Sequence, residues 1–292
     1  YGVDAGISVD RFAPRVSFFF NAHNDFFEEI AKYRAARKLW ANVMRERFGA
    51  RSDRSLKLRF HAQTAGVSLT AQQPYNNVVR TSIQALASVI GGTNSLHTNS
   101  LDEALALPSR DAALLALRTQ QLIAHESGVP EVTDPFGGSF FLERLTRDLE
   151  IGALEYFEKI DQFGGMVEAI EQGFPQSEIA NSAFRFQQEI ESGERSLVGV
   201  NEHIEDKSET PFETLYIDEA VAERQVAALQ EVKSKRDSMQ VIAALDAVRM
   251  AAEGTQNLMD PLLEAVRAHA TLGEICDSLR DVWGEYEEAA FL

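Results

Sequence analysis

Two stretches of this 292-residue sequence follow one pattern: Leu58-Arg-Phe-His-Ala-Gln-Thr-Ala-Gly66 and Gly91-Gly-Thr-Asn-Ser-Leu-His-Thr-Asn-Ser100. In each, a short run typical of a buried strand leads into small and polar residues. Polar groups at the carboxyl ends of strands are where ligands bind in parallel α/β proteins. A third strand end of this kind is expected at Arg15–Asn21. We therefore expect these three strand ends to meet at one site.

A helix-forming segment follows each of the three expected strands. The strands and helices alternate in the order 15–20, about 26–48, 56–62, about 76–90, 95–98, and helical sequence to about Ser127. Such a series predicts an α/β fold with a parallel sheet or a (β/α) barrel. Eight units are needed to close a barrel. The chain is therefore expected to form an open sheet or part of a barrel.

Beyond Gly128 the pattern changes to helices alone. We expect a boundary there, with strand–helix units in residues 1–128 and a mostly helical region for packing and subunit contacts in residues 129–292. The stretch 197–200 reads as extended, and the charged stretch 205–210 reads as a linker. Cys276 falls mid-helix and is expected to be a small buried residue.

The composition narrows the class of protein. A net charge of −17 disfavours nucleic acid as a partner, because phosphate binding needs a basic face. The single cysteine excludes an intrachain disulfide and favours a reducing cytoplasm. No apolar run approaches the ~18 residues of a membrane span, and no metal-ligand spacing is seen. The chain begins with Tyr1, not Met, which suggests a start inside a longer protein.

Several motifs, taken together and in order, resemble one enzyme family. Besides the two quoted stretches they are Phe18–Glu29, Asp134-Pro-Phe-Gly-Gly-Ser139, Gly164–Ile170 and Val198-Gly-Val-Asn201. They resemble the large subunit of the methylmalonyl-CoA mutase family, with isobutyryl-CoA and 2-hydroxyisobutyryl-CoA mutases as close relatives. The resemblance covers nearly the whole chain.

The resemblance implies a (β/α)8 barrel of the TIM type that threads the CoA tail and is capped by adenosylcobalamin. This chain would supply the last three or so βα units and the helical region that follows them. The family's cobalamin-binding Asp-x-His-x-x-Gly motif is absent from the sequence. A separate small cobalamin-binding subunit is therefore expected, and the carboxyl end resembles that of a stand-alone large subunit. An oligomer and a GTPase chaperone are further expected partners.

Substrate-binding residues are expected on the first and third strands: Arg15, Ser17, Phe19, Asn94 and Ser95. Arg15 and Ser17 lie two apart, so on a strand they share one face with Phe19. An arginine pointing into a barrel is costly unless an anion meets it, and the resemblance implies that Arg15 and Ser17 bind the CoA portion. The alternative is that Arg15 faces solvent or Asp10. Asn94 and Ser95, at the third strand, are also implied to contact the substrate.

Catalytic and cofactor-binding residues are expected at and after the carboxyl ends of the second and third strands. His61 and Gln63 are hydrogen-bonding groups that share a strand face, and the resemblance implies that they line the substrate pocket. Gly66 has no side chain, so a flat macrocycle can approach its backbone. By resemblance, Glu103 accepts hydrogen bonds from the adenosyl ribose. The resemblance also implies that the cofactor packs on two apolar positions, Ala106 and Leu107.

The main hypothesis is an adenosylcobalamin-dependent radical isomerase that converts (R)-methylmalonyl-CoA to succinyl-CoA. Alternatives are an isobutyryl-CoA or 2-hydroxyisobutyryl-CoA mutase large subunit, or a non-catalytic scaffold that binds a cobalamin-carrying partner. A weaker rival is an unrelated barrel aldolase or lyase, which would need a lysine or metal site at the strand ends.

Overall fold

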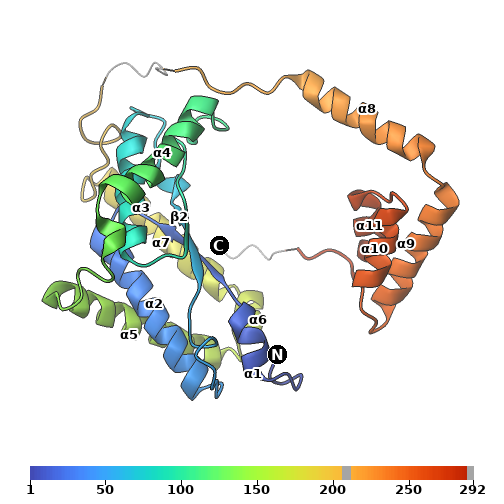
Figure 1. The fold of residues 1–292 in the computed structure, drawn as a ribbon, viewed down its shortest axis with the longest axis horizontal. Coiled ribbons are helices and arrows are strands. Elements are labelled where there is room, and N and C mark those ends of the chain that lie inside the picture. The colour runs from blue at the N-terminus through green and yellow to red at the C-terminus, as the bar shows by residue number, and fades with distance from the viewer. Residues whose placement is uncertain (206–211, 288–292) are drawn as a thin grey trace. The chain divides into compact units, whose positions relative to one another are not determined.

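A three-stranded parallel sheet organises the amino-terminal part of the chain in the computed structural model (Figure 1). Its strands are β1 (Phe18–Ala22), β2 (Phe60–Thr64) and β3 (Ser95–His97), paired in the order β1-β2-β3. All pairs are parallel, so the three carboxyl ends lie at the same edge of the sheet. The predicted class of parallel α/β fold is thereby confirmed.

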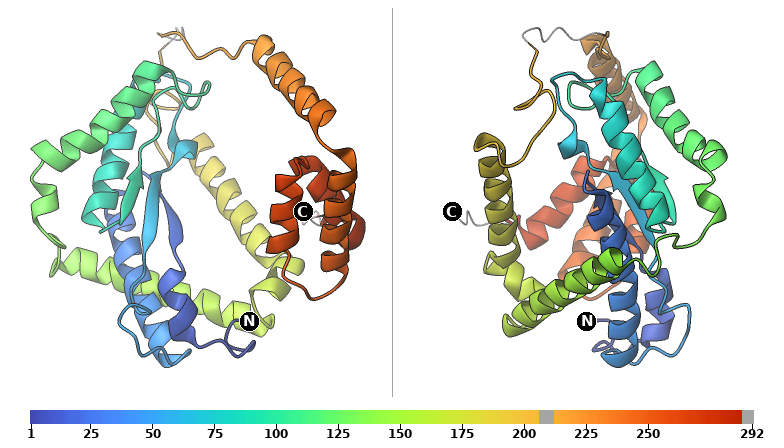
Figure 2. Two further views of the ribbon diagram at one scale, coloured as in Figure 1. Left: turned by 45° about the vertical axis from the view of Figure 1, so that its right-hand side comes forward. Right: turned by 90° about the vertical axis from the view of Figure 1, so that its left-hand side faces the viewer.

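The helices α2 (Phe26–Glu46) and α3 (Asn76–Ile90) connect the strands and pack against each other. These two helices cover one face of the sheet (Figure 2). Tyr33 of α2 is fully buried there and stacks on Phe60 with 4.9 Å between ring centroids. Residues of alternate strand positions complete this core: Phe18, Phe20, Ala62 and Leu96.

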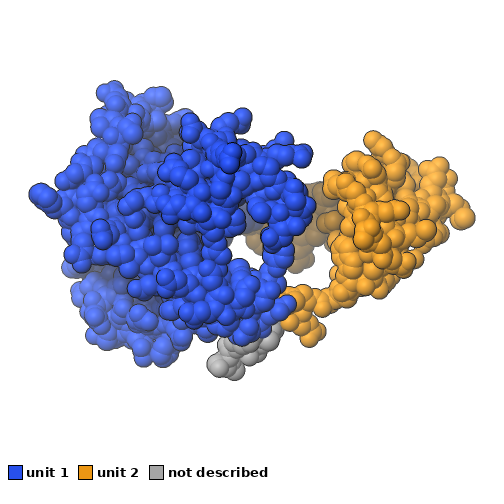
Figure 3. All heavy atoms as spheres, turned by 90° about the horizontal axis from the view of Figure 1, so that it is seen from below, with its two compact units in different colours: residues 1–215 blue, residues 216–292 orange. Residues whose placement is uncertain are grey.

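The structure describes residues 1–205 and 212–287, and they divide into two compact units, Tyr1–Leu215 and Tyr216–Leu292 (Figure 3). The remaining helices of the first unit are α1 (Val9–Phe12), α4 (Arg110–Glu126), α5 (Phe140–Gln162), α6 (Met166–Glu171) and α7 (Phe174–Glu191). Short 3₁₀ helices span Ala13–Arg15, Gly66–Ser68 and Val129–Glu131. Among the described residues, no helix is both long and apolar enough to cross a membrane.

The first strand begins later than predicted. Arg15 ends a 3₁₀ helix whose second residue is Pro14, and β1 begins only at Phe18. The reason is the fixed φ of proline, which closes a turn in which the Val16 N–H donates to the Ala13 carbonyl at 3.1 Å. The prediction that Arg15 lies on the strand is therefore wrong. The second strand, expected at 56–62, is likewise displaced to 60–64.

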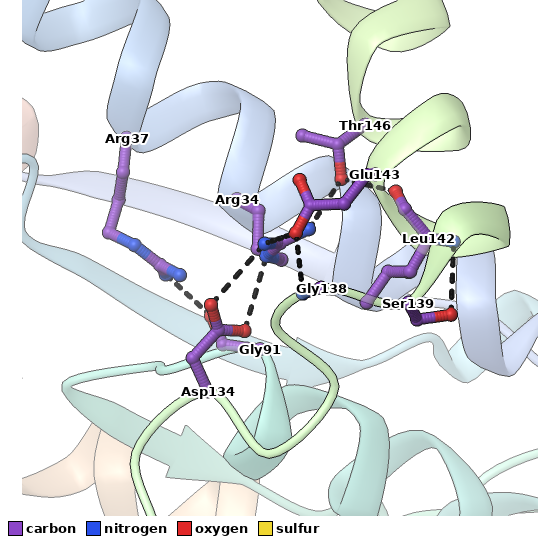
Figure 4. A network of polar contacts seen from close by, with 9 residues as sticks. All are labelled: Arg34, Arg37, Gly91, Asp134, Gly138, Ser139, Leu142, Glu143 and Thr146. Carbon is purple, nitrogen blue, oxygen red and sulfur yellow. Dashed lines mark hydrogen bonds and ion pairs between the residues drawn. The ribbon is translucent and has the colours of Figure 1, made fainter.

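The change of pattern at Gly128 does not interrupt the packing of the first unit. Helix α5 lies across α2, and Arg34 of α2 joins the two (Figure 4). Its guanidinium donates to Glu143 Oε1 at 2.7 Å and to Thr146 Oγ1 at 3.1 Å, and it pairs with Asp134 at 3.2 Å. Burial lowers the pKa of Arg34, but the carboxylates of Glu143 and Asp134 outweigh it and hold this pKa above its usual value. This network ties the helical segment to the strand–helix units.

The cleft beside this network has a volume of about 890 Å³ and lies between α2 and α5. Most of its charges pair with each other, as Arg34 does with Glu143 and Lys38 with Glu150 at 2.7 Å. None of the predicted site residues lines it. We therefore assign the cleft to packing rather than to the site.

The stretch expected to be extended at 197–200 is mostly a turn. Only Val198 makes a strand-like bridge, to Glu202, and Gly199 has φ +84°. The side chain of Asn201 closes the turn by accepting from the Leu197 N–H at 2.6 Å. Arg80 of α3 donates to the Val198 carbonyl at 2.8 Å, which docks the turn on the first unit. The charged linker expected at 205–210 lies, from residue 206, outside the described residues.

The second unit contains α8 (Glu219–Lys235), α9 (Ser238–Glu253), α10 (Met259–Arg267) and α11 (Leu272–Trp283). Its core is formed by Val248, Ala265 and Ile275. Cys276, the neighbour of Ile275, points away from this core and is exposed. The prediction of a buried cysteine is therefore wrong, because helix α11 buries only one face.

Candidate functional site

The second face of the sheet is open in the part of the chain that the structure describes. Strand register places two rows of side chains on it. Phe19, His61 and Ser95 form the first row, and Asn21, Gln63 and His97 form the second. All six are exposed or half-buried, whereas their neighbours in sequence are turned to the covered face. An uncovered face with an aromatic, two imidazoles and two amides is a candidate ligand-binding surface.

The first row is held together by direct contacts. His61 Nδ1 lies 2.7 Å from Ser95 Oγ, which is a hydrogen bond. The ring of Phe19 lies on the other side of His61, with 5.2 Å between centroids, and is 59% exposed. The structure thus brings together three of the predicted residues from three different strands. This hydrogen bond orients the imidazole, and a ligand contact by its second nitrogen stays a prediction.

Arg15 and Ser17 lie at the other end of β1, before its first residue. Although Arg15 is not on the strand, both residues are exposed and alternate in burial with Val16 and Phe18. The rival partner for Arg15 is occupied, since Asp10 accepts from Ser55 Oγ at 2.6 Å and from the backbone of residues 51 and 52. The hydroxyl of Ser55 is the main cause that lowers the pKa of Asp10. Arg15 is exposed, and its contact with an anion stays a prediction.

Asn94 has a structural contact in this arrangement. Its side-chain oxygen accepts from the Phe60 N–H at 3.0 Å, where β2 and β3 begin to pair. The side-chain oxygen of Asn94 is therefore used to hold the two strands together. A substrate contact by the side-chain NH₂ group of Asn94 stays a prediction.

The carboxyl ends of β2 and β3 bring Gly66 and Glu103 together. A Cβ atom on Gly66 would lie 2.7 Å from Asn99 Nδ2 and 3.0 Å from Glu103 Oε1. The exposed Glu103 and the buried Asn99 therefore border the same point above the glycine. Only a residue without a side chain leaves room for these two side chains so close to its backbone.

Ala106 and Leu107 follow Glu103 in a turn and not in a helix, because α4 begins only at Arg110. The turn is closed by the Ala106 N–H, which donates to the Asp102 carbonyl at 3.0 Å, and by Asp102 Oδ2, which accepts from the Ser109 N–H at 2.9 Å. Leu107 is 57% exposed. An exposed leucine beside a polar strand end fits the expectation of an apolar contact with a ligand, which stays a prediction.

Four residues that sequence reasoning did not single out as site residues belong to this region. Asn21 and His97 share the open face because they lie two residues from Phe19 and Ser95, so the period of two along a strand was a usable signal. Thr64 and Asn99 meet across the strand ends, with Thr64 Oγ1 donating to Asn99 Oδ1 at 3.0 Å. Nothing in the local sequence pairs these two residues, which are 35 apart.

Comparison with known proteins identifies the family of the chain. The sequence profile described as methylmalonyl-CoA mutase matches residues 1–285. The chain belongs to the methylmalonyl-CoA mutase family. The resemblance expected from the motifs is therefore confirmed.

Three curated relatives show the range of names within the family. The chain is 47% identical over 284 residues to the 2-hydroxyisobutanoyl-CoA mutase large subunit of Aquincola tertiaricarbonis, covering 97% of this chain and 50% of the relative. It is 47% identical over 286 residues to a probable mitochondrial methylmalonyl-CoA mutase of Caenorhabditis elegans, covering 98% and 38%. The human mitochondrial methylmalonyl-CoA mutase is 46% identical over 288 residues, again covering 98% and 38%. The chain thus spans half or less of the length of these relatives.

Proposed function

We propose that the protein carrying this chain is an adenosylcobalamin-dependent carbon-skeleton mutase of branched acyl-CoA esters. The chain would contribute part of a (β/α)8 barrel, with its open sheet face turned to the interior. The observation that carries the proposal is the open face itself, on which Phe19, His61 and Ser95 stand in one row. Family membership supplies the class of reaction.

The shape of the open face suits a long substrate. From Ser17 to Asn21 an extended chain rises about 13 Å. Arg15 and Ser17 at the amino end would bind the phosphate-bearing CoA portion, because a guanidinium binds phosphate well. The acyl group would then lie near His61 and Gln63, towards the carboxyl ends of the strands.

His61 and Gln63 would hold the thioester and the acyl carboxylate by hydrogen bonds. Ser95 fixes the imidazole, so its free nitrogen needs no reorientation when the substrate arrives. Phe19 would pack along the acyl-pantetheine region and keep water away from the reacting carbons. These residues position the substrate and exclude solvent.

The residues at the strand ends fit a large flat cofactor. Gly66 has no side chain, so Asn99 and Glu103 can lie close to its backbone, and the exposed Glu103 offers a carboxylate to vicinal hydroxyl groups. The exposed Leu107 and the half-buried Ala106 offer apolar contacts. When bound, adenosylcobalamin would supply the radical that takes a hydrogen from the acyl group and returns it after rearrangement.

Methylmalonyl-CoA is the substrate that we propose first, giving succinyl-CoA. The relatives named for methylmalonyl-CoA and for 2-hydroxyisobutanoyl-CoA are equally similar to this chain, so isobutyryl-CoA and 2-hydroxyisobutyryl-CoA are alternatives. One relative is named a large subunit, which supports a separate cobalamin-binding subunit as partner. An oligomer, a GTPase chaperone and a cytoplasmic location stay predictions.

The test is turnover by the full-length protein with the cobalamin-binding subunit and adenosylcobalamin added. Methylmalonyl-CoA, isobutyryl-CoA and 2-hydroxyisobutyryl-CoA are assayed in parallel, with wild type and His61→Ala. Isomerisation of one ester that requires the cofactor and falls at least about a hundredfold in the variant supports the proposal. Absence of turnover with all three esters would overturn it and favour a scaffold role.

A further inference from the structure

Thr64 and Asn99 form a buried pair where β2 ends and the chain leaves β3. Thr64 is fully buried, and Asn99 is 2% exposed. The Asn99 backbone N–H donates to Thr64 Oγ1 at 2.9 Å. The Thr64 hydroxyl in turn donates to Asn99 Oδ1 at 3.0 Å. One hydroxyl therefore binds both the backbone and the side chain of the same asparagine.

This pair of bonds fixes which way the Asn99 amide points. The Thr64 oxygen already accepts from a backbone N–H, so its single proton is free to donate. The side-chain atom that accepts this proton must be the carbonyl oxygen of Asn99, since an amide NH₂ accepts no hydrogen bond. The NH₂ group of Asn99 therefore points the other way, towards the space above Gly66.

The Asn99 NH₂ group has no acceptor in the described part of the chain, although Nδ2 is buried. A buried donor without a partner is unfavourable, and such groups in a native protein need an explanation. The Glu103 carboxylate borders the same point above Gly66, where a Cβ would lie 3.0 Å from Oε1 and 2.7 Å from Asn99 Nδ2. Glu103 is exposed, so its side chain has room to turn.

We infer that Thr64 and Asn99 are positioning residues for Glu103. The Asn99 NH₂ group donates to one carboxylate oxygen of Glu103 when a ligand fills the strand-end site. This bond leaves the other oxygen for the hydroxyl groups of the ligand. The inference rests on the proposed function, because it takes the cofactor as the ligand that Glu103 meets.

The test compares three variants of the full-length protein with the cobalamin-binding subunit. Thr64→Val keeps the shape of the side chain but removes the hydroxyl, so the Asn99 amide is free to turn its oxygen towards Glu103. Thr64→Ser keeps the hydroxyl and should restore the wild-type behaviour. Thr81→Val is the matched control, since Thr81 is also buried and its hydroxyl has no partner among the described residues.

Adenosylcobalamin affinity is measured by absorbance titration, and folding by circular dichroism and thermal unfolding. Thr64→Val should weaken binding about tenfold or more, the value of a hydrogen bond to a charged group, while Thr64→Ser and Thr81→Val stay within about threefold of wild type. A structure of the wild-type complex should place a Glu103 carboxylate oxygen within about 3.2 Å of Asn99 Nδ2.

Wild-type affinity in a folded Thr64→Val variant overturns the inference, as does a complex in which Glu103 points away from Asn99. If Thr64→Val does not fold, the structure of the complex decides. Wild-type protein that binds no adenosylcobalamin contradicts the proposed function itself, and that outcome is distinct from equal binding by wild type and Thr64→Val.

Discussion

The structure predicts how the replacement of Gly66 by alanine would change both stability and cofactor affinity. The backbone of Gly66 does not have a positive φ, so alanine meets no strain of its own there. The new methyl group, however, would lie 2.7 Å from Asn99 Nδ2 and 3.0 Å from Glu103 Oε1. Contacts this short require at least one of the two side chains to move.

The two neighbours respond differently. Glu103 is exposed and moves at little cost, but it then leaves the place that the proposed function gives it. Asn99 is buried and held by Thr64, and moving it breaks hydrogen bonds worth about 1 kcal/mol each. With the general cost of overpacking, we expect Gly66→Ala to lower the free energy of unfolding by about 1–3 kcal/mol. Cofactor affinity should fall more than tenfold, because the displaced Glu103 carboxylate would no longer be placed to accept hydrogen bonds from the cofactor.

The assay is urea denaturation and adenosylcobalamin titration of the full-length protein. Gly152→Ala is the control, because Gly152 lies inside α5 and an added Cβ there meets nothing within 4 Å. Alanine in a helix interior should stabilise the control by about 0.5–1 kcal/mol without changing affinity. Gly66→Ala with wild-type stability and wild-type affinity would refute the reasoning.

Three further predictions concern the packing of each unit and the open face. Arg34→Met should lower the free energy of unfolding by about 2 kcal/mol in urea denaturation, because it removes bonds to Glu143 and Thr146, whereas Arg144→Met, at a surface pair with Asp148, should change it by less than about 0.5 kcal/mol. Equal effects of the two would contradict the assignment of Arg34 as the link between α2 and α5. In the second unit, hydrogen bonds from Arg236 hold the pKa of Glu274 well below its usual range. The pair therefore stabilises the fold at pH values above the unfolded pKa of about 4.3 and loses this contribution as the pH falls further, so Glu274→Gln should lower the Tm at pH 7 and flatten its decline in acid. Parallel Tm profiles of wild type and Glu274→Gln between pH 7 and pH 2 would show the pair to be unimportant. Ser95→Ala should reduce turnover about tenfold, less than His61→Ala, because it removes the hydroxyl that orients the imidazole but keeps the imidazole itself. A loss as large as that of His61→Ala would point to a direct role of Ser95.

Much of the fold could be predicted because the signals are local. Helix α3 begins and ends where its pattern predicts, at Asn76 and Ile90. Asp25 caps α2 by accepting from the Glu28 N–H at 3.1 Å, as an acid before a helix should. The alternation that predicted a shared face for Arg15, Ser17 and Phe19 is seen in their exposure, even though Arg15 precedes the strand.

Contacts between residues far apart in the sequence could not be predicted. The strand at β1 begins where the Phe18 N–H meets the Arg59 carbonyl at 2.9 Å, a partner 41 residues away. The link between Arg34 and Glu143 spans 109 residues, and that between Thr64 and Asn99 spans 35. Such partners have no signature in the local pattern, because each depends on how strands and helices pack. The strand ends therefore predicted a candidate site, and only the structure shows which side chains meet there.

The most direct test of the central claim is a structure of the full-length protein with its acyl-CoA substrate bound. The account predicts that the open face of β1, β2 and β3 lines a barrel interior, with the acyl thioester within hydrogen-bond distance of His61 or Gln63. Arg15 should lie near the phosphate-bearing end of CoA. A structure in which other elements pack against Phe19, His61 and Ser95 as a closed core, with the ester bound elsewhere, would contradict it.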